Sequence, residues 1–207
     1  MKVLAFSDLH TDLRACQRLV EVARANEVQV AVGAGDFAIM RRGLQPVIDE
    51  LAKLPCPVVF VPGNGESVDE LKAACSGYDL MHVLHGSSVV IGSQVFFGLG
   101  YAVPETPFGS WSCDLSEDAA AEMLRDCPSG CVLVSHSPPL GHVDQNSRGE
   151  HVGSRTILDT IQRVRPKMVC CGHVHDSWQT TSRVGDVPIY NLGPVGSLLM
   201  LDGAEVA

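Results

Sequence analysis

Five short apolar segments in this sequence each lead into side chains that can bind a metal ion. The side chains that follow them are Asp8 and His10, Asp36, Asn64, His136, and the pair His173 and His175. Apolar segments of this length that end at turn residues predict strands buried on both faces. Helical patterns between them indicate parallel βαβ units, whose ligands collect beyond the carboxyl ends of the strands. We therefore expect the seven side chains to converge on one pocket.

The first of these segments is open to a second interpretation. In an extended chain, residues two apart point the same way, so Asp8 and His10 could reach one cation together. Alternatively, Asp8 and Thr11 could serve only to start the helix that follows. The histidines further along the chain favour the first interpretation.

The remaining elements are predicted from periodicity, caps and turn residues. Helices are expected over residues 11–25 with Thr11 or Asp12 as the cap, over 43–54, after the Ser67 capping box, and over 116–125 and 154–164. Three closely spaced runs, 81–84, 87–91 and 94–99, leave no room for crossover helices and predict antiparallel hairpins. The runs 179–184, 187–191 and 197–201 also predict antiparallel strands. Segments 100–113 and 141–153 are expected to be loops that face the substrate.

Composition limits the fold and the partners. The 207 residues are 45% hydrophobic, which suits one domain over residues 1–207 with a sizeable aliphatic core. The net charge of −9 and a pI near 5.2 argue against binding of long nucleic acids. The sequence shows no leader pattern and no apolar run long enough for a bilayer, so we expect a cytoplasmic protein without a membrane partner. The eight cysteines include no Cys-x-x-Cys pair and are expected to be buried, neutral thiols.

The seven candidate ligands are two carboxylates, one amide oxygen and four imidazoles. This mixture suits manganese, iron(II) or zinc better than magnesium or calcium, which prefer oxygen ligands alone. Seven ligands exceed what one transition ion needs, whereas two divalent ions that share one carboxylate fit the number. Any one of these histidines alone would more often be an ordinary residue, but their coincidence at strand ends favours a metal site.

Taken in order, these residues resemble the calcineurin-like metallophosphoesterase family. The family pattern is Asp-x-His, Gly-Asp, Gly-Asn-His-Asp/Glu, a lone His after a strand, and Gly-His-x-His. The matching residues are Asp8-Leu9-His10, Gly35-Asp36, Gly63-Asn64-Gly65-Glu66, His136 and Gly172-His173-Val174-His175. Asp144, followed by His151-Val152-Gly153-Ser154, resembles small bacterial members and the related animal brain-type phosphodiesterases.

The resemblance implies an α/β fold, a four-layer α/β/β/α sandwich of two mixed sheets, with a dinuclear metal site. By similarity, one ion would be held by Asp8, His10, Asp36 and His175, and the other by Asp36, Asn64, His136 and His173. Asp36 would bridge the two. Of the candidate metals, manganese is the one we expect to support activity in vitro.

Gly65 stands where the family usually has a histidine that interacts with the scissile phosphate and protonates the leaving oxygen. A general acid contributes roughly 10²- to 10⁴-fold in rate, and glycine has no proton to donate. Glycine could instead be required by a tight turn with positive φ. His151 or His142 could replace the acid, although the sequence favours a surface or loop-bracing role for each. Without an acid at this position, aryl diesters should be hydrolysed better than alkyl monoesters.

These observations predict a dinuclear metal-dependent phosphoesterase that hydrolyses phosphodiesters, or activated phosphomonoesters, by attack of a hydroxide that bridges the ions. Asp36, Asn64 and His136 are the candidate catalytic residues, and Asn64, Gly65 and His151 the candidate substrate-binding residues. The expected substrate is a small phosphate ester, a nucleotide among the candidates, and the hairpins could support a homodimer. Three alternatives stay open: a metal-dependent nucleotide-binding or regulatory protein with weakened catalysis, a nuclease, and a purely structural metal site.

Overall fold

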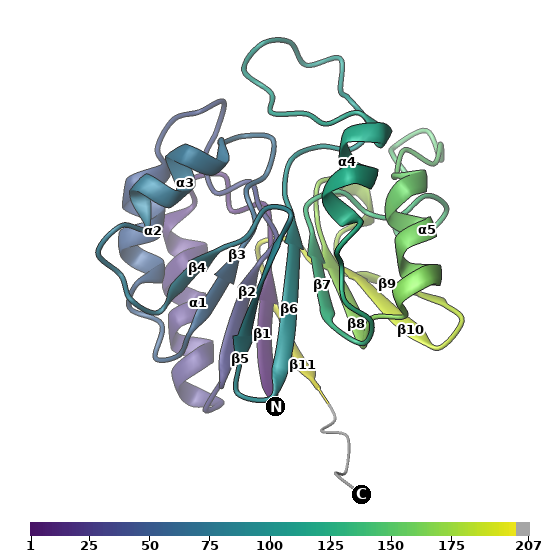
Figure 1. The fold of residues 1–207 in the computed structure, drawn as a ribbon. Coiled ribbons are helices and arrows are strands. Elements are labelled where there is room, and N and C mark those ends of the chain that lie inside the picture. Colours follow the sequence, from purple (N-terminus) through teal and green to yellow (C-terminus); the bar gives the residue numbers. More distant parts are fainter. Residues whose placement is uncertain (202–207) are drawn as a thin grey trace, which may run out of the picture.

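Two mixed β-sheets pack face to face, with helices on their outer sides (Figure 1), in a computed structural model that describes residues 1–201. The first sheet has the strand order β11 (Ser197–Met200), β1 (Lys2–Phe6), β2 (Val30–Gly33), β3 (Val58–Phe60) and β4 (Met81–Val83). The second has the order β5 (Ser87–Ile91), β6 (Gln94–Leu99), β7 (Val132–Ser135), β8 (Met168–Cys171), β10 (Val187–Asn191) and β9 (Thr180–Val184). The edge strands β11, β5 and β9 are antiparallel to their neighbours, and the other pairs are parallel.

Successive side chains point to opposite faces of each strand, and their packing forms three hydrophobic layers in the interior. In β1, Leu4 and Phe6 face the helices α1 (Leu13–Ala25), α2 (Leu44–Leu51) and α3 (Val68–Ala74), whereas Val3 and Ala5 face the second sheet. The outer face of the second sheet packs against α4 (Glu117–Leu124) and α5 (Arg155–Val164). Three hydrophobic layers between four layers of elements confirm the predicted α/β/β/α sandwich.

Most of the helices begin at the polar residues that the sequence indicated. Asp12 caps α1 by accepting from the backbone N–H groups of Arg14 and Ala15, and Ser67 forms the predicted capping box with Glu70. Ser116 and Ser154 cap α4 and α5 through their side-chain oxygens. Each such cap typically contributes about 1 kcal/mol to stability. Within residues 1–201, no helix has the length and apolar character needed to cross a bilayer.

One part of the predicted strand pairing is wrong. The run 81–84 was expected to join an antiparallel hairpin, but β4 pairs in parallel with β3 at the edge of the first sheet. The short helix α3 provides the crossover, and the chain passes to the second sheet only between β4 and β5. The predicted hairpins of β5 with β6 and of β9 with β10 are confirmed. The eight cysteines are free thiols, and seven of them are buried as expected.

Candidate metal centre

The loops after β1, β2, β3, β7 and β8 carry the seven predicted ligands to the same edge of the two sheets. The backbone is left-handed at Asp8, His10, Asp36 and His173, with φ between 43° and 67°. Such backbone is costly for non-glycine residues and clusters at functional sites, where surrounding contacts hold it in place. The expectation that Asp8 and His10 continue an extended strand is wrong, because β1 ends at Phe6 and both residues lie in this left-handed loop.

His10, His175 and Asp8 form the first group of candidate ligands. The Nε2 atoms of His10 and His175 lie 3.1 Å apart, and His175 Nε2 lies 3.6 Å from Asp8 Oδ1. His10 Nδ1 lies 3.3 Å from the carbonyl oxygen of Ala38 and can donate to it, which leaves Nε2 as an unprotonated acceptor. His10 Nε2 thus faces His175 Nε2 as an acceptor, and a proton or a cation between the two nitrogens would stabilise this arrangement.

His136, Asn64 and His173 form the second group. His136 is fully buried, and its Nδ1 donates to the carbonyl oxygen of Ala34 at 2.8 Å, so its Nε2 is an acceptor. This Nε2 lies 3.1 Å from Asn64 Oδ1 and 3.2 Å from His173 Nδ1. The amide of Asn64 is oriented by its Nδ2, which donates to Ser112 Oγ at 3.2 Å. Metal–ligand bonds of roughly 2.0–2.2 Å place neighbouring ligand atoms about 3.0–3.5 Å apart, so these spacings fit a transition ion.

Asp36 lies between the two groups. Its Oδ2 is 3.8 Å from His10 Nε2, and its Oδ1 is 3.6 Å from His136 Nε2. Asp8 is also close to both groups, because its carboxylate lies within 4.8 Å of ligand atoms in each. However, Asp8 Oδ2 already accepts hydrogen bonds from Ser7 Oγ and from the indole N–H of Trp178 at 3.1 Å. Asp36 thus presents a separate oxygen to each group, Oδ2 to His10 and Oδ1 to His136.

Burial and mutual repulsion perturb the ionisation of these groups. Burial and the charge of Asp8 raise the pKa of Asp36 to about 7. Burial also opposes ionisation of Asp8, but hydrogen bonding to His175 and the charge of His136 outweigh it and lower the pKa of Asp8 to about 2. Burial and the neighbouring His136 lower the pKa of His173 to about 3, so this ring is neutral, as a metal ligand must be. A divalent cation would relieve the repulsion between the two carboxylates.

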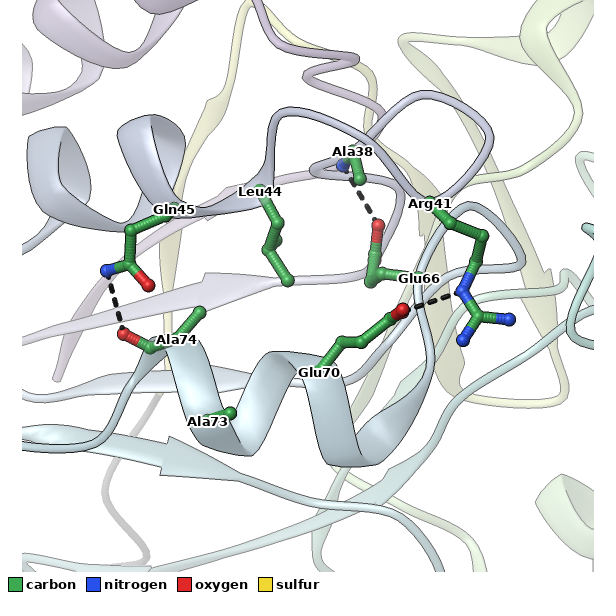
Figure 2. A pocket seen from close by; sticks show the side chains of 8 residues that line it. All are labelled: Ala38, Arg41, Leu44, Gln45, Glu66, Glu70, Ala73 and Ala74. Carbon is green, nitrogen blue, oxygen red and sulfur yellow. Dashed lines mark hydrogen bonds and ion pairs between the residues drawn. The ribbon is translucent and has the colours of Figure 1, made fainter.

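Glu66 holds two of the ligand loops together, a role that sequence reasoning missed. It is fully buried, and its Oε1 accepts from the backbone N–H groups of Asp36 at 2.9 Å and Gly63 at 2.7 Å. Its Oε2 accepts from the Ala38 N–H at 2.9 Å, a bond drawn in Figure 2. Burial and the charge of Asp36 raise the pKa of Glu66 to about 7. The signal for this role was the acidic residue at the end of Gly63-Asn64-Gly65-Glu66.

Gly63 is required by close approach of the backbone to Asp36, whereas a side chain at Gly65 would meet only tight contacts. A Cβ at Gly63 would lie 2.1 Å from Asp36 Oδ1 and 2.2 Å from the Asp36 backbone nitrogen. A Cβ at Gly65 would lie 3.0 Å from the Ala38 carbonyl oxygen and 3.1 Å from Asp36 Oδ1. The alternative explanation of Gly65 as a turn residue with positive φ is wrong, because its φ is not positive. The Gly65 N–H instead donates to Asp36 Oδ1 at 2.7 Å.

A cavity of about 710 Å³ opens over the candidate ligands. Its lining comes from both predicted substrate-facing loops and from the ligands His10, Asp36, Asn64, His173 and His175. His151 is not among the lining residues. Its Nδ1 donates at 2.5 Å to the buried Asp144, which also accepts the backbone N–H groups of Gly141 and Gly153. His142 likewise bonds within the fold, through Nδ1 to Ser182 Oγ at 2.8 Å. These contacts brace the loop of residues 141–153.

The sequence pattern of the calcineurin-like phosphoesterase superfamily domain matches residues 1–207. The chain belongs to this superfamily. This calcineurin-like phosphoesterase is 29% identical to UPF0046 protein K07C11.7 of Caenorhabditis elegans over 200 residues, which cover 85% of the chain and 64% of that protein. It is 28% identical to human metallophosphoesterase domain-containing protein 1 over 152 residues, 68% of the chain and 44% of that protein. The chain therefore spans less than two thirds of the length of these relatives.

Solved structures share the fold of this calcineurin-like phosphoesterase. The protein TT1561 of Thermus thermophilus superimposes with a TM-score of 0.77 at 17% identity, over 96% of this chain and 93% of that one. A dimetal phosphatase from Danio rerio superimposes with a TM-score of 0.63 at 13% identity, over 94% of this chain and 88% of that one. At these identities the likeness concerns the fold alone.

Proposed function

We propose that this calcineurin-like phosphoesterase binds two divalent ions and hydrolyses small phosphodiesters or activated phosphomonoesters. The observation that carries the proposal is the convergence of acceptor atoms around Asp36, with His10 Nε2 on one side and His136 Nε2 on the other. Acceptor atoms that face one another in this way are stabilised by a proton or a cation between them, and divalent cations can serve all of them at once. Membership of the phosphoesterase superfamily supports the same chemistry.

The residues would divide between two ions that share Asp36. Asp8, His10 and His175 complete one set, and Asn64, His136 and His173 complete the other. Divalent ions bound there supply positive charge for the phosphoryl oxygens and make a water molecule more acidic. We propose manganese, iron or zinc, because imidazole nitrogen accompanies oxygen in both sets.

The chain's own contribution is to orient these ligands before the substrate binds. The carbonyl oxygens of Ala34 and Ala38 face the Nδ1 atoms of His136 and His10, which directs both Nε2 atoms toward Asp36. Ser112 orients the amide of Asn64 in the same way. Because these contacts are formed within the protein, little reorganisation is needed when charge develops on the substrate.

Gly65 determines which esters should react. No side chain at this position can protonate a leaving oxygen, so we propose that aryl esters, whose leaving groups depart as stable anions, react faster than alkyl esters. Gly65 is also the observation that favours a second candidate, a metal-dependent nucleotide-binding protein with weakened catalysis. Nucleotide binding without turnover in any of the three metals would favour that second function.

The test is hydrolysis of bis(p-nitrophenyl) phosphate in manganese by the wild-type protein and by Asp36→Asn. We expect Asp36→Asn to lose at least about 100-fold in rate, because both ligand groups lose their common carboxylate. Asp126→Asn is the matched control, since Asp126 is exposed after α4, and its rate should equal that of the wild type. Equal rates for Asp36→Asn and wild type would refute the two-metal proposal.

A further inference from the structure

The cavity over the ligands is larger than a phosphate group requires. Its volume of about 710 Å³ lies within the range of roughly 300–1,000 Å³ that is typical of sites for small organic molecules. Its lining combines candidate metal ligands with the apolar residues Pro104, Pro107, Phe108 and Trp111, and it also includes the charged residues Glu105, Arg148 and Asp176. The cavity therefore offers polar atoms to a phosphoryl group and apolar side chains to an organic group.

The apolar residues of the lining include two parallel aromatic rings. The rings of Phe108 and Trp111 have centroids 5.7 Å apart and planes 3° apart, which makes them an offset stack. Phe108 is 51% exposed, whereas the other five phenylalanines of the chain are buried. The loop between β6 and α4 that carries these rings projects beyond the ends of the sheets in Figure 1. Trp111 is half-buried, so the pair presents mainly the exposed Phe108 and part of Trp111 to a ligand in the cavity.

Hydrogen bonds tie this loop to itself and to one of the candidate ligands. The carboxylate of Asp114 accepts from the backbone N–H of Thr106 at 3.1 Å and from Ser112 Oγ at 2.7 Å, so it closes the loop around both rings. Ser112 Oγ accepts in turn from Asn64 Nδ2 at 3.2 Å, and the Cys113 N–H donates to the Asn64 carbonyl oxygen at 3.0 Å. The aromatic pair is thus held at a fixed position relative to Asn64.

From this arrangement we infer that Phe108 and Trp111 form an aromatic wall that selects phosphate esters carrying a flat aromatic group. The phosphoryl group binds at the candidate ligands, and the aromatic group stacks against the wall. The inference rests on the proposed function, because it uses the same cavity. It adds the class of organic group and the two residues that recognise it.

Binding of three phosphonates to the manganese-loaded protein, measured by calorimetry, tests the wall without requiring turnover. Phenylphosphonate carries a flat ring, cyclohexylphosphonate an apolar ring of similar size that is not flat, and methylphosphonate neither. Stacking on an aromatic side chain is worth roughly tenfold in affinity, so phenylphosphonate should bind about ten times more tightly than methylphosphonate. Cyclohexylphosphonate should be the weaker of the two ring compounds, because it cannot stack.

Variants of the two aromatic residues test whether these side chains cause the preference for phenylphosphonate. Trp111→Ala should lower the affinity for phenylphosphonate about tenfold and leave that for methylphosphonate unchanged, and Phe108→Ala should act in the same direction. Val90→Ala is the control, because Val90 is 65% exposed and pairs with Val95 at the start of β6, away from the ligand edge.

Two results would overturn the inference in distinguishable ways. Equal binding of all three phosphonates, with normal Asp36-dependent hydrolysis, overturns the wall and leaves the proposed function standing. Failure of every phosphonate to bind, together with no hydrolysis in any metal, overturns both.

Discussion

Replacement of Gly63 by alanine should separate the Asp36 loop from the Asn64 loop. The new Cβ would lie 2.1 Å from Asp36 Oδ1 and 2.2 Å from the Asp36 backbone nitrogen, whereas an ordinary contact begins near 3.4 Å. Side-chain rotation cannot relieve the contact with a backbone atom, so the two loops must move apart by about 1 Å. The bonds from Gly63 and Asp36 to Glu66 connect the same two loops and would be strained by this movement.

Two effects of this movement can be estimated. Overpacking of this kind costs about 1–3 kcal/mol, which for a chain of this length lowers the Tm by about 2–12 °C. Displacement of a site residue by about 1 Å can cost 10²-fold in rate, so hydrolysis of bis(p-nitrophenyl) phosphate should fall by about that factor. Manganese affinity, measured by calorimetry, should fall as well, because Asp36 faces both ligand groups.

Gly77→Ala provides the matched control for this prediction. Gly77 has a φ of 95°, and no atom beyond its two chain neighbours lies within 4 Å of a Cβ built there. Alanine at this position should therefore cost about 1 kcal/mol of backbone strain without touching the site. We expect Gly77→Ala to lower the Tm but to leave manganese affinity and rate unchanged. If Gly63→Ala retains wild-type manganese affinity and rate, the argument from close packing is refuted.

Three further predictions concern metal, leaving group and pH. Manganese at about 100 times its Kd should stabilise the fold by about 2.7 kcal/mol and raise the Tm by about 5–10 °C, and a chelator should reverse this increase. An unchanged Tm would contradict a metal site in the folded protein. Gly65→His should hydrolyse alkyl esters at least about tenfold faster than Gly65→Ala. Gly65→Ala is the control, because its Cβ makes the same close contacts with Ala38 and Asp36. Equal rates would show that another group already supplies the proton. Burial and the charge of Lys72 lower the pKa of His85 to about 4, so His85 is neutral in the folded state and accepts the Gly100 N–H. Between about pH 6.5 and about pH 4 the unfolded chain takes up this proton and the folded chain does not, so metal-free protein should lose up to about 3 kcal/mol of stability as the pH falls through this range. Urea titrations should show a smaller loss for His85→Asn.

Local sequence determined most of the element order. Apolar runs such as those of β1 and β8 are buried on both faces, and this burial is already visible in their composition. The caps at Ser67 and Ser154 depend on hydrogen bonds within the first turn of each helix, so they too could be predicted. The partner of β4 could not, because strand pairing depends on which distant segment lies alongside.

The candidate site likewise combines features that the sequence determined with features that only the tertiary structure decided. The chemistry of the seven candidate ligands, and their position after strands, were determined by the sequence alone, because side-chain type and local periodicity are properties of single segments. Tertiary structure alone decided which atoms face Asp36, since the Ala34 and Ala38 carbonyl oxygens that direct His136 and His10 lie on other loops. The tertiary structure also decided that Glu66 accepts the Asp36 N–H and that the loop carrying Phe108 and Trp111 is hydrogen-bonded to Asn64. These contacts join residues far apart in the chain, and their geometry exists only once the two sheets have packed together.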